Sequence, residues 1–243
     1  MQFKTPGVLT VCSYSQFQPV TYGDGKGYEA DLLRAVARTW NVRTRFYTEN
    51  IYEGIWRLPS RAYTLCDVSI GGITPTDARA HEGAAFSVTT ALFQQSLLVR
   101  KSDLDSGKIT SYDSFKGTSL KIGVVPGTTG EQYAHVNAKD HGVPASVFMQ
   151  YASESELIPA LKSKSIDAIA RGEIGNEYQQ SLDPSLATIA KRDFNEGFAV
   201  AVDANNQTLL RKLNEAIECL TDHGKVNVDL WLRQPNVFDR LCP

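Results

Sequence analysis

The sequence predicts an α/β fold with two lobes, each built on a mostly parallel sheet flanked by helices. Short apolar runs with strand composition alternate with longer segments of helical spacing along most of the 243 residues. The order strand, helix, strand, helix, strand implies parallel strands joined by right-handed crossovers. A polar segment at residues 101–108 interrupts this order, and a second parallel pattern follows it. We therefore place a lobe boundary near residue 102.

The composition is that of an ordinary globular protein, with 42% apolar and 21% charged residues. No apolar run approaches the roughly 18 residues that a membrane span requires. The net charge of -2, without a basic block, argues against nucleic acid as a partner. Residues 1–6 lack the charged start and apolar middle of a secretion signal. We therefore expect either a cytosolic protein or the mature part of a secreted chain.

The first lobe begins with three expected strands, at residues 8–13, 42–47 and 65–70. The first two are separated by an amphipathic helix at 28–40, and a short helix opens near Tyr52 before the third. Ligands of parallel sheets bind beyond the carboxyl ends of the strands. The loops that leave the first and third strands are therefore the places to look for a site.

The loop after the third strand, GGITPTDAR at 71–79, has the composition of an anion clamp. Thr76 is a plausible N-cap for the helix that follows. Arg79 carries a permanent charge and a fork of donors that suits a carboxylate or phosphate. The backbone of Gly72 and the hydroxyl of Thr74 would complete the clamp.

The alternative for Arg79 is a surface ion pair with Asp77 or Glu82, which local sequence alone favours. The loop after the first strand changes this balance because it carries Tyr14 and Phe17, aromatic residues that can wall a pocket or cap the core. Both loops would emerge at the same edge of the sheet. This convergence favours the clamp.

A second anion seat is predicted where the strand at 120–125 runs into a helix. The turn contains Gly127, Thr128 and Thr129, and Thr128 has capping-box spacing to Glu131. Free N–H groups and the positive dipole end of the helix would face an anion there. An ordinary strand-to-helix turn is the alternative. The Lys and glycine spacing of a nucleotide P-loop are absent.

The remaining elements complete the second lobe and return to the first. Strands are expected at 147–150, 166–170, 187–190 and 197–202, and a strongly amphipathic helix at 207–222.

The four cysteines have no metal-site or redox spacing. Cys12 lies inside the strand candidate at 8–13 and Cys66 inside the one at 65–70, and a bridge between them is possible if those strands are neighbours. Cys219 lies late in a helix and Cys242 near the end of the chain, so that a bridge between them would pin the tail. Four buried free thiols are the alternative. We expect two disulfides and an oxidising compartment.

Several motifs, in order and over almost the whole chain, resemble the amino-acid-binding group of type II periplasmic solute-binding proteins, the bacterial extracellular solute-binding proteins of family 3. They are YEADLL, CDVSIGGITPTDAR with Phe86 and Ser87 after it, VVPGTTGE, ALKSKSIDAIA and LLRKLNEAI.

The resemblance implies the periplasmic-binding-protein type II fold, in which two lobes joined by two crossings clamp a ligand by hinge closure. Lobe 1 would comprise residues 1–100 and 204–243, and lobe 2 residues 101–203. The hinge would lie near 98–102 and 199–203.

The resemblance also implies roles for the first-lobe residues. Arg79 would pair with the ligand carboxylate, and Gly72 and Thr74 would bind the ligand's ammonium and carboxylate. Phe17 and Tyr52 would sandwich the ligand side chain, as two matching aromatics do in the family.

In the second lobe, Thr128 with its neighbours Gly127 and Thr129 would provide a further carboxylate seat. One position departs from the family pattern: the acid that takes the ligand's ammonium after IDAIA is replaced by Gly172. Glu173 could serve after a one-residue slip, or Arg171 could face the cleft and favour a second anionic group.

Two further members of the fold are alternatives. Cyclohexadienyl dehydratases share a stretch of this type and need second-lobe acids, which correspond here to Gly172 and Gly175 and leave Glu173 as the nearby substitute. Some periplasmic oxidation-system proteins resemble this chain in the Cys12 and Cys66 positions.

The sequence therefore predicts a monomeric periplasmic binding protein for an amino acid or small organic acid, rather than an enzyme. The resemblance implies ABC transporter membrane subunits as partners. No cofactor or metal is expected.

Overall fold

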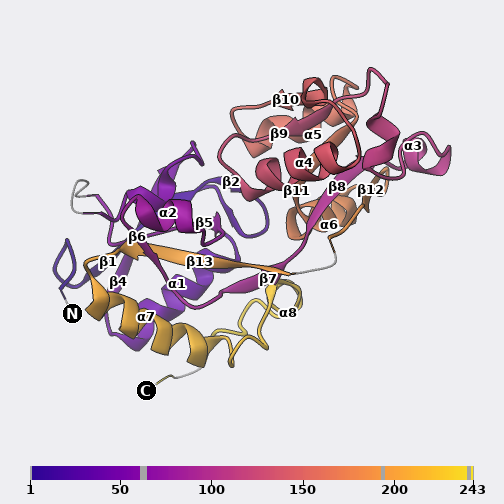
Figure 1. The fold of residues 1–243 in the computed structure, drawn as a ribbon. Helices are drawn as coiled ribbons and strands as arrows, with labels where there is room; N and C mark the ends of the chain where they lie inside the picture. Colours follow the sequence, from indigo (N-terminus) through magenta and orange to yellow (C-terminus); the bar gives the residue numbers. More distant parts are fainter. Residues whose placement is uncertain (1, 61–64, 193–194, 240–241, 243) are drawn as a thin grey trace. The chain divides into compact units, whose positions relative to one another are not determined.

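The computed structural model describes residues 2–60, 65–192, 195–239 and 242. The chain divides into two compact units. Unit 1 comprises residues 1–92 and 197–243, and unit 2 comprises residues 93–196 (Figure 1). Unit 2 is thus one continuous insertion into the chain of unit 1.

Unit 1 is built on a sheet whose strands are ordered β4-β1-β5-β13-β6. These strands are β1 (Val8–Tyr14), β4 (Arg43–Glu49), β5 (Val68–Ile73), β6 (Ala84–Phe86) and β13 (Glu196–Asp203). The strand β1 pairs in parallel with β4 and β5, whereas β13 runs antiparallel to β5 and β6. A short strand, β7 (Ala91–Phe93), also pairs with β13.

The helices of unit 1 are α1 (Tyr28–Thr39), α2 (Asp77–His81), α7 (Gln207–Leu220) and α8 (Val228–Arg233), with the short 3-10 helix η1 (Ile55–Arg57). The small hairpin of β2 (Gln16–Phe17) and β3 (Thr21–Tyr22) follows β1. Helices α1 and α7 pack against each other through their apolar faces (Figure 1). Their buried residues, led by Leu33, Val36 and Leu213, form much of the core of this unit.

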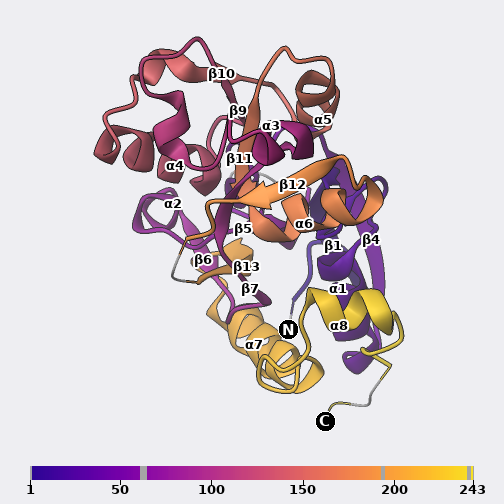
Figure 2. The ribbon, with the colours of Figure 1, turned by 90° about the vertical axis from the view of Figure 1, so that its right-hand side faces the viewer.

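Unit 2 has a sheet ordered β10-β9-β11-β8-β12. Its strands are β8 (Gln95–Arg100), β9 (Ile122–Val124), β10 (Phe148–Gln150), β11 (Ala168–Gly172) and β12 (Leu186–Ile189). Its helices are α3 (Lys101–Asp105), α4 (Thr129–Asp140), α5 (Glu154–Lys162) and α6 (Glu173–Leu182), with 3-10 turns η2 (Tyr112–Phe115) and η3 (Ala145–Val147). The strand β9 is parallel to β10 and β11, and β8 is antiparallel to β11 and β12. Helix α6 packs along β12 and β8 (Figure 2).

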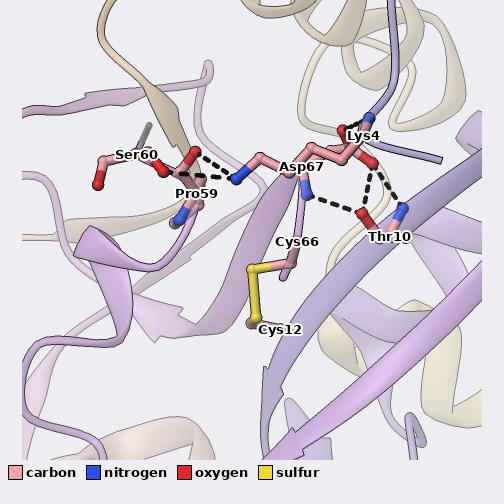
Figure 3. The surroundings of a disulfide bond; sticks show 7 residues. All are labelled: Lys4, Thr10, Cys12, Pro59, Ser60, Cys66 and Asp67. Atoms are coloured by element: carbon pink, nitrogen blue, oxygen red, sulfur yellow. Dashed lines mark hydrogen bonds between the residues drawn. A yellow bond between two sulfur atoms is a disulfide. The ribbon is translucent and has the colours of Figure 1, made fainter. Parts of the chain in front are cut away.

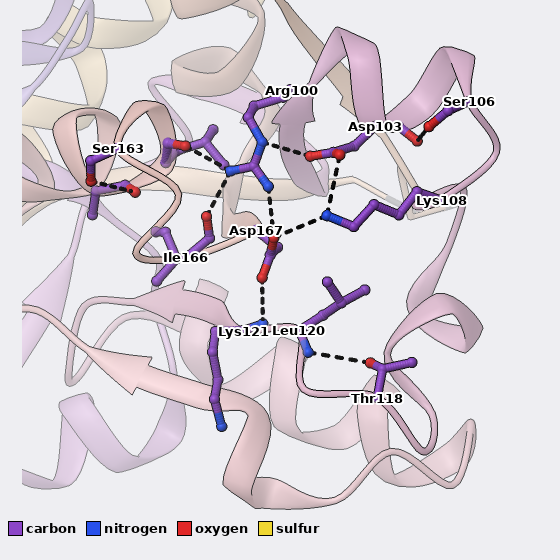
Figure 4. A network of polar contacts seen from close by, with 12 residues as sticks. Arg100, Asp103, Ser106, Lys108, Thr118, Leu120, Lys121, Ser163, Ile166 and Asp167 are labelled. Carbon is purple, nitrogen blue, oxygen red and sulfur yellow. Dashed lines mark hydrogen bonds and ion pairs between the residues drawn. The ribbon is translucent and has the colours of Figure 1, made fainter.

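A buried charge network fastens the elements of unit 2 at the end of β8. The guanidinium of Arg100 donates to the backbone oxygens of Leu161 and Ile166 and to the carboxylates of Asp103 and Asp167 (Figure 4). Asp167 also accepts the backbone N–H of Lys121. The network therefore joins β8, α3, α5 and the residues that lead into the strands β9 and β11.

These observations confirm the predicted α/β class, with two sheets flanked by helices. The third strand differs in its bounds: β5 continues through both glycines of the GGI motif to Ile73, and all its residues are buried. The reason is that Ile73 pairs with Ala199 of the distant strand β13, which the local sequence does not show.

The units join at two points in the chain, after Leu92 and before Gly197. Residues 98–100 of the predicted first crossing lie in β8, and residues 199–203 of the second lie in β13. The hinge and the lobe bounds given above stay predictions.

Candidate functional site

Arg79 is positioned by the short helix α2, which begins just after β5. Thr76 is its N-cap, as predicted, and the Thr76 hydroxyl accepts the backbone N–H of Arg79 at 3.2 Å. The guanidinium turns back toward the strand end and donates from Nη1 to the backbone oxygen of Thr74 at 2.6 Å. The guanidinium of Arg79 is thus held against the backbone of Thr74, a residue of the predicted clamp.

Arg79 is a buried residue, with 3% of its surface exposed. Its Cζ lies 4.3 Å from the ring centroid of Trp56 and 5.5 Å from that of Tyr52. Such cation–aromatic contacts stabilise a guanidinium that has lost much of its hydration. The side chain is therefore not at the surface, where the alternative of an ion pair places it. Glu82 accepts the Trp56 indole N–H at 2.7 Å and pairs with Arg57 at 3.7 Å.

Gly72 adopts a left-handed conformation, with φ of 64°. A Cβ at this position would lie 2.7 Å from Cε1 of Phe17, which is closer than packing allows. The backbone oxygen of Gly72 accepts the Tyr52 hydroxyl at 3.1 Å. Only glycine fits both this backbone conformation and this close approach. The structure therefore brings Phe17, Tyr52 and Gly72 together.

Tyr14 contacts this group and is almost completely buried. Its ring meets that of Tyr52 edge to face, with centroids 5.3 Å apart. The Cβ of Tyr14 would be 2.8 Å from a Cβ on Gly71. Tyr14 therefore supports Tyr52 and the glycine pair from within the core.

The sequence analysis missed Glu29, the acid of the YEADLL motif. This side chain is fully buried, and its Oε2 accepts the backbone N–H groups of Gly71 at 3.1 Å and Gly72 at 2.9 Å. Its Oε1 accepts the Thr90 hydroxyl at 2.9 Å. Burial raises the pKa of Glu29 to about 7, although the three hydrogen bonds oppose the shift.

A signal for Glu29 was present in the sequence. Glu29 shares helical spacing with Leu32, Leu33 and Val36, which places the carboxylate on the apolar face of α1. An acid on such a face needs hydrogen-bond partners in the core. The sequence could not show that those partners are the glycines of β5.

The predicted anion seat in unit 2 is already in contact with an internal carboxylate. Thr128 is the N-cap of α4, and its hydroxyl accepts the N–H of Glu131 at 3.0 Å and donates to the Val125 oxygen at 2.8 Å. The carboxylate of Glu131 accepts the N–H of Gly127 at 3.0 Å. Thr129 accepts a hydrogen bond from the amide of Gln95 at 3.1 Å.

Arg171 lies in a buried network within unit 2. It donates to the Glu154 carboxylate at 2.9 Å, to the Asn176 amide oxygen at 2.7 Å and to the backbone oxygen of Gly175 at 3.1 Å. Arg171 and Glu154 are both at least nine-tenths buried. These three bonds join β11, α5 and α6. A contact between Arg171 and a ligand stays a prediction.

Glu173 begins helix α6, next to Gly172 at the end of β11. Its carboxylate accepts the backbone N–H of Gln94 at 2.8 Å, and its own N–H donates to the oxygen of Gln94 at 2.7 Å. Glu173 is half-buried and anchored to the chain just before β8. A role toward an ammonium group stays a proposal.

Both predicted disulfides are present. Cys12 of β1 is bonded to Cys66, which lies two residues before β5, and both residues are fully buried (Figure 3). Asp67, next to Cys66, accepts the backbone N–H groups of Lys4 and Thr10 and so ties the same region together. Cys219 of α7 is bonded to Cys242 near the end of the chain.

The described part of the chain contains no cluster of three or more acids, histidines or cysteines that could hold a metal ion. Within residues 2–60, 65–192 and 195–239, no helix has both the length and the apolarity to cross a membrane.

Two known proteins are similar to this chain over most of its length. The chain is 25% identical to a probable histidine-binding protein of Neisseria gonorrhoeae, over 90% of this chain and 81% of that protein. It is 26% identical to ABC transporter arginine-binding protein 1 of Escherichia coli (strain K12), over 86% and 82% respectively.

A solved structure of an ancestral arginine-binding protein bound to arginine superposes with a TM-score of 0.78. The two are 26% identical, with 93% of this chain and 97% of that chain covered. A family model matches residues 9–228, which include Glu29, Gly72, Arg79 and Arg171. The chain belongs to the bacterial extracellular solute-binding proteins, family 3.

Proposed function

We propose that this chain is a periplasmic substrate-binding protein that captures an amino acid and delivers it to the membrane subunits of an ABC transporter. The observation that carries the proposal is the buried guanidinium of Arg79, held against Trp56 and Tyr52 at the end of β5. Family membership and the names of the two relatives support it. Arginine and histidine are the first ligands to test.

In this proposal Arg79 binds the ligand carboxylate in a bidentate pair, as the planar fork of its donors allows. The hydroxyl of Thr74 and the backbone of Gly72 add polar contacts, and Phe17 and Tyr52 flank the ligand side chain. The burial of Arg79 favours such a partner, because a charge removed from water gains most from a close opposite charge.

Unit 2 contributes the turn at 127–129 and Glu173. A ligand carboxylate at this turn would compete with Glu131 for the N–H of Gly127, so that Glu131 would have to release it. Glu173 is proposed to take the ligand's ammonium in place of the acid absent at Gly172. Capture by closure of the two lobes about the chain crossings completes the proposal.

The relatives are named as binding proteins, and we propose that this chain has no dehydratase activity. Two internal disulfides are consistent with a protein that works in an oxidising compartment. We also propose that it is a monomer, which sedimentation would test.

Isothermal titration with L-arginine, L-histidine and L-glutamine, after a thermal-shift screen of amino acids and organic acids, tests the function. A ligand that binds only the folded state raises the melting temperature. Arg79→Ala is expected to lose roughly 2 to 5 kcal/mol of binding free energy. Arg211→Ala, at an exposed position on α7, is the matched control.

Wild-type affinity in Arg79→Ala would rule out the clamp. Turnover of prephenate or arogenate by the purified protein would instead support the dehydratase alternative. A ligand-induced decrease in the radius of gyration, measured by small-angle X-ray scattering, is expected if the lobes close.

A further inference from the structure

A single buried carboxyl group organises the residues around the proposed ligand site. Glu29 uses one oxygen, Oε2, to accept the N–H groups of two consecutive residues, Gly71 and Gly72. The other oxygen, Oε1, accepts the Thr90 hydroxyl. Glu29 therefore contacts two segments that are distant in sequence, one at the end of β5 and one just before β7.

The first segment leads directly to Arg79. The two bonds to Glu29 fix the orientation of the peptide groups at Gly71 and Gly72, where the chain takes its left-handed turn. The Gly72 oxygen then accepts the Tyr52 hydroxyl at 3.1 Å. The Tyr52 ring in turn lies 5.5 Å from Cζ of Arg79. Each step in this series is a direct contact.

The second segment is the stretch with which the chain leaves unit 1. Thr90 lies two residues before Leu92, the last residue of the first part of unit 1. Its backbone oxygen accepts the Tyr28 hydroxyl at 2.6 Å, and its N–H donates to Phe198 at 2.8 Å. The hydroxyl bond to Glu29 is thus one of three that hold this residue.

We propose that Glu29 is a positioning residue of the binding site. It fixes the Gly71–Gly72 backbone that contacts Tyr52, and through Tyr52 it orients Arg79. It also couples this backbone to the Thr90 segment. The ligand-binding part of this inference rests on the proposed function. The contrasting possibility is a core acid whose loss lowers stability and leaves the site of the folded molecules unchanged.

The surroundings of Glu29 explain why a neutral amide can replace it. Its own helix contributes Tyr28, whose phenol pKa is raised by burial and by the nearby Glu29 charge. Residues 68–73 of β5 and residues 87–92 carry no titratable side chain, and the 16–22 hairpin region contributes only Tyr22. A glutamine can accept both glycine N–H groups through its oxygen and donate to Thr90 through its nitrogen, because a hydroxyl both donates and accepts.

A leucine of similar size would leave both glycine N–H groups buried without an acceptor, which is costly. The test therefore compares Glu29→Gln with Glu29→Leu. Thr90→Val removes only the Oε1 partner. Glu215→Leu, at an exposed position on α7, is the matched control for loss of an acid.

Two measurements are needed on each variant. The first is amide hydrogen exchange at Gly71 and Gly72 in the ligand-free protein, followed by NMR. The second is titration with L-arginine and L-histidine, corrected for the folded fraction by circular dichroism. The first measurement does not depend on any ligand, so a wild-type protein that binds none of the amino acids would refute the proposed function while still testing the positioning.

Glu29→Leu is expected to lose about tenfold or more in both affinity and exchange protection, because two buried donors lose their acceptor. Glu29→Gln should stay within about threefold of wild type in affinity. Because affinity is corrected for the folded fraction, a loss of affinity in Glu29→Leu that Glu29→Gln does not show separates positioning from a general loss of stability. Glu215→Leu should match wild type.

Unchanged affinity and unchanged glycine protection in folded Glu29→Leu would overturn the inference. If that variant does not fold, Thr90→Val decides: a loss of several-fold in Gly71 and Gly72 protection supports the coupling, and wild-type protection refutes it. A Glu29→Gln variant that loses affinity as strongly as a leucine substitution would also refute it.

Discussion

The guanidinium of Arg79 lies over the indole ring of Trp56, with Cζ 4.3 Å from the ring centroid. The indole is itself held in place, because its N–H donates to Glu82 at 2.7 Å. Trp56 belongs to the short helix η1, whereas Arg79 belongs to α2. A cation–aromatic contact between two separate elements therefore orients the group that we propose to bind the ligand carboxylate.

Replacing Trp56 by leucine is expected to weaken ligand binding without abolishing it. Arg79 would keep its charge but lose the ring that stabilises and orients it, at a cost of roughly 0.5 to 2 kcal/mol. Titration with L-arginine or L-histidine measures the change. Trp40→Leu, in the C-cap of α1, controls for the loss of an indole elsewhere in unit 1. Equal affinity in Trp56→Leu and wild type would contradict this role.

Arg171 is expected to stabilise unit 2 rather than to bind ligand. Arg171→Met would leave the buried carboxylate of Glu154 without its partner, which costs about 3 to 5 kcal/mol in comparable cases. The double variant Arg171→Met, Glu154→Leu should recover much of this loss, since it removes both charges. Urea unfolding measures both effects.

A contrary result for Arg171 would be a large loss of ligand affinity in Arg171→Met with little change in the free energy of unfolding. That outcome would restore the interpretation of Arg171 as a residue that contacts the ligand.

The contrast between Arg79 and Arg171 shows what the sequence could and could not predict. The features around Arg79 are local: a broken strand, a threonine cap and one arginine within nine residues. Arg171 looked similar, at a strand end beside glycine, but its partner Glu154 comes from a helix 17 residues earlier. Glu29 was missed for the same reason, since its acceptor role depends on Gly72, 43 residues away. Contacts between residues this far apart in the sequence are set by tertiary packing, which hydrophobic periodicity does not encode.

The strand and helix order was predictable because hydrophobic spacing is a local property. The end of β5 was not, because it depends on pairing between Ile73 and Ala199 of β13. The two disulfides were partly predictable from the sequence. Cys12 and Cys66 could be paired once the neighbouring strands had been recognised.

The stability of the protein is expected to depend on pH through Glu29. Its pKa is raised from 4.5 to about 7 in the folded state. The folded protein therefore binds a proton more tightly than the unfolded chain does. The stabilisation that follows from this raised pKa is fully present below pH about 4.5 and is lost as the pH rises through about 7. It amounts to about 3 kcal/mol in the free energy of unfolding.

Comparison of wild type with Glu29→Gln isolates this contribution, because other titrating groups are common to both proteins. The free energy of unfolding of wild type, relative to the variant, should fall between pH 4.5 and 8. A constant difference over this range would show that Glu29 does not titrate there.

The two disulfides are expected to contribute unequally. The Cys12–Cys66 bridge spans a sequence separation of 54 residues, and the Cys219–Cys242 bridge spans 23. Loop-closure entropy predicts roughly 4 kcal/mol for the longer loop and roughly 3.5 kcal/mol for the shorter one. Paired Cys→Ser variants, compared by urea unfolding, measure both. A larger loss from the 219–242 pair would contradict the entropic account.

The place of β13 in the sheet has a consequence for biosynthesis. It lies between β5 and β6, yet all of it except Glu196 is made only after unit 2. During translation, unit 2 has its complete sequence while β5 still presents an open edge, which invites pairing with other chains. A nascent chain paused near residue 196 would therefore need protection at this edge, and emergence of β13 from the ribosome is the event that closes it.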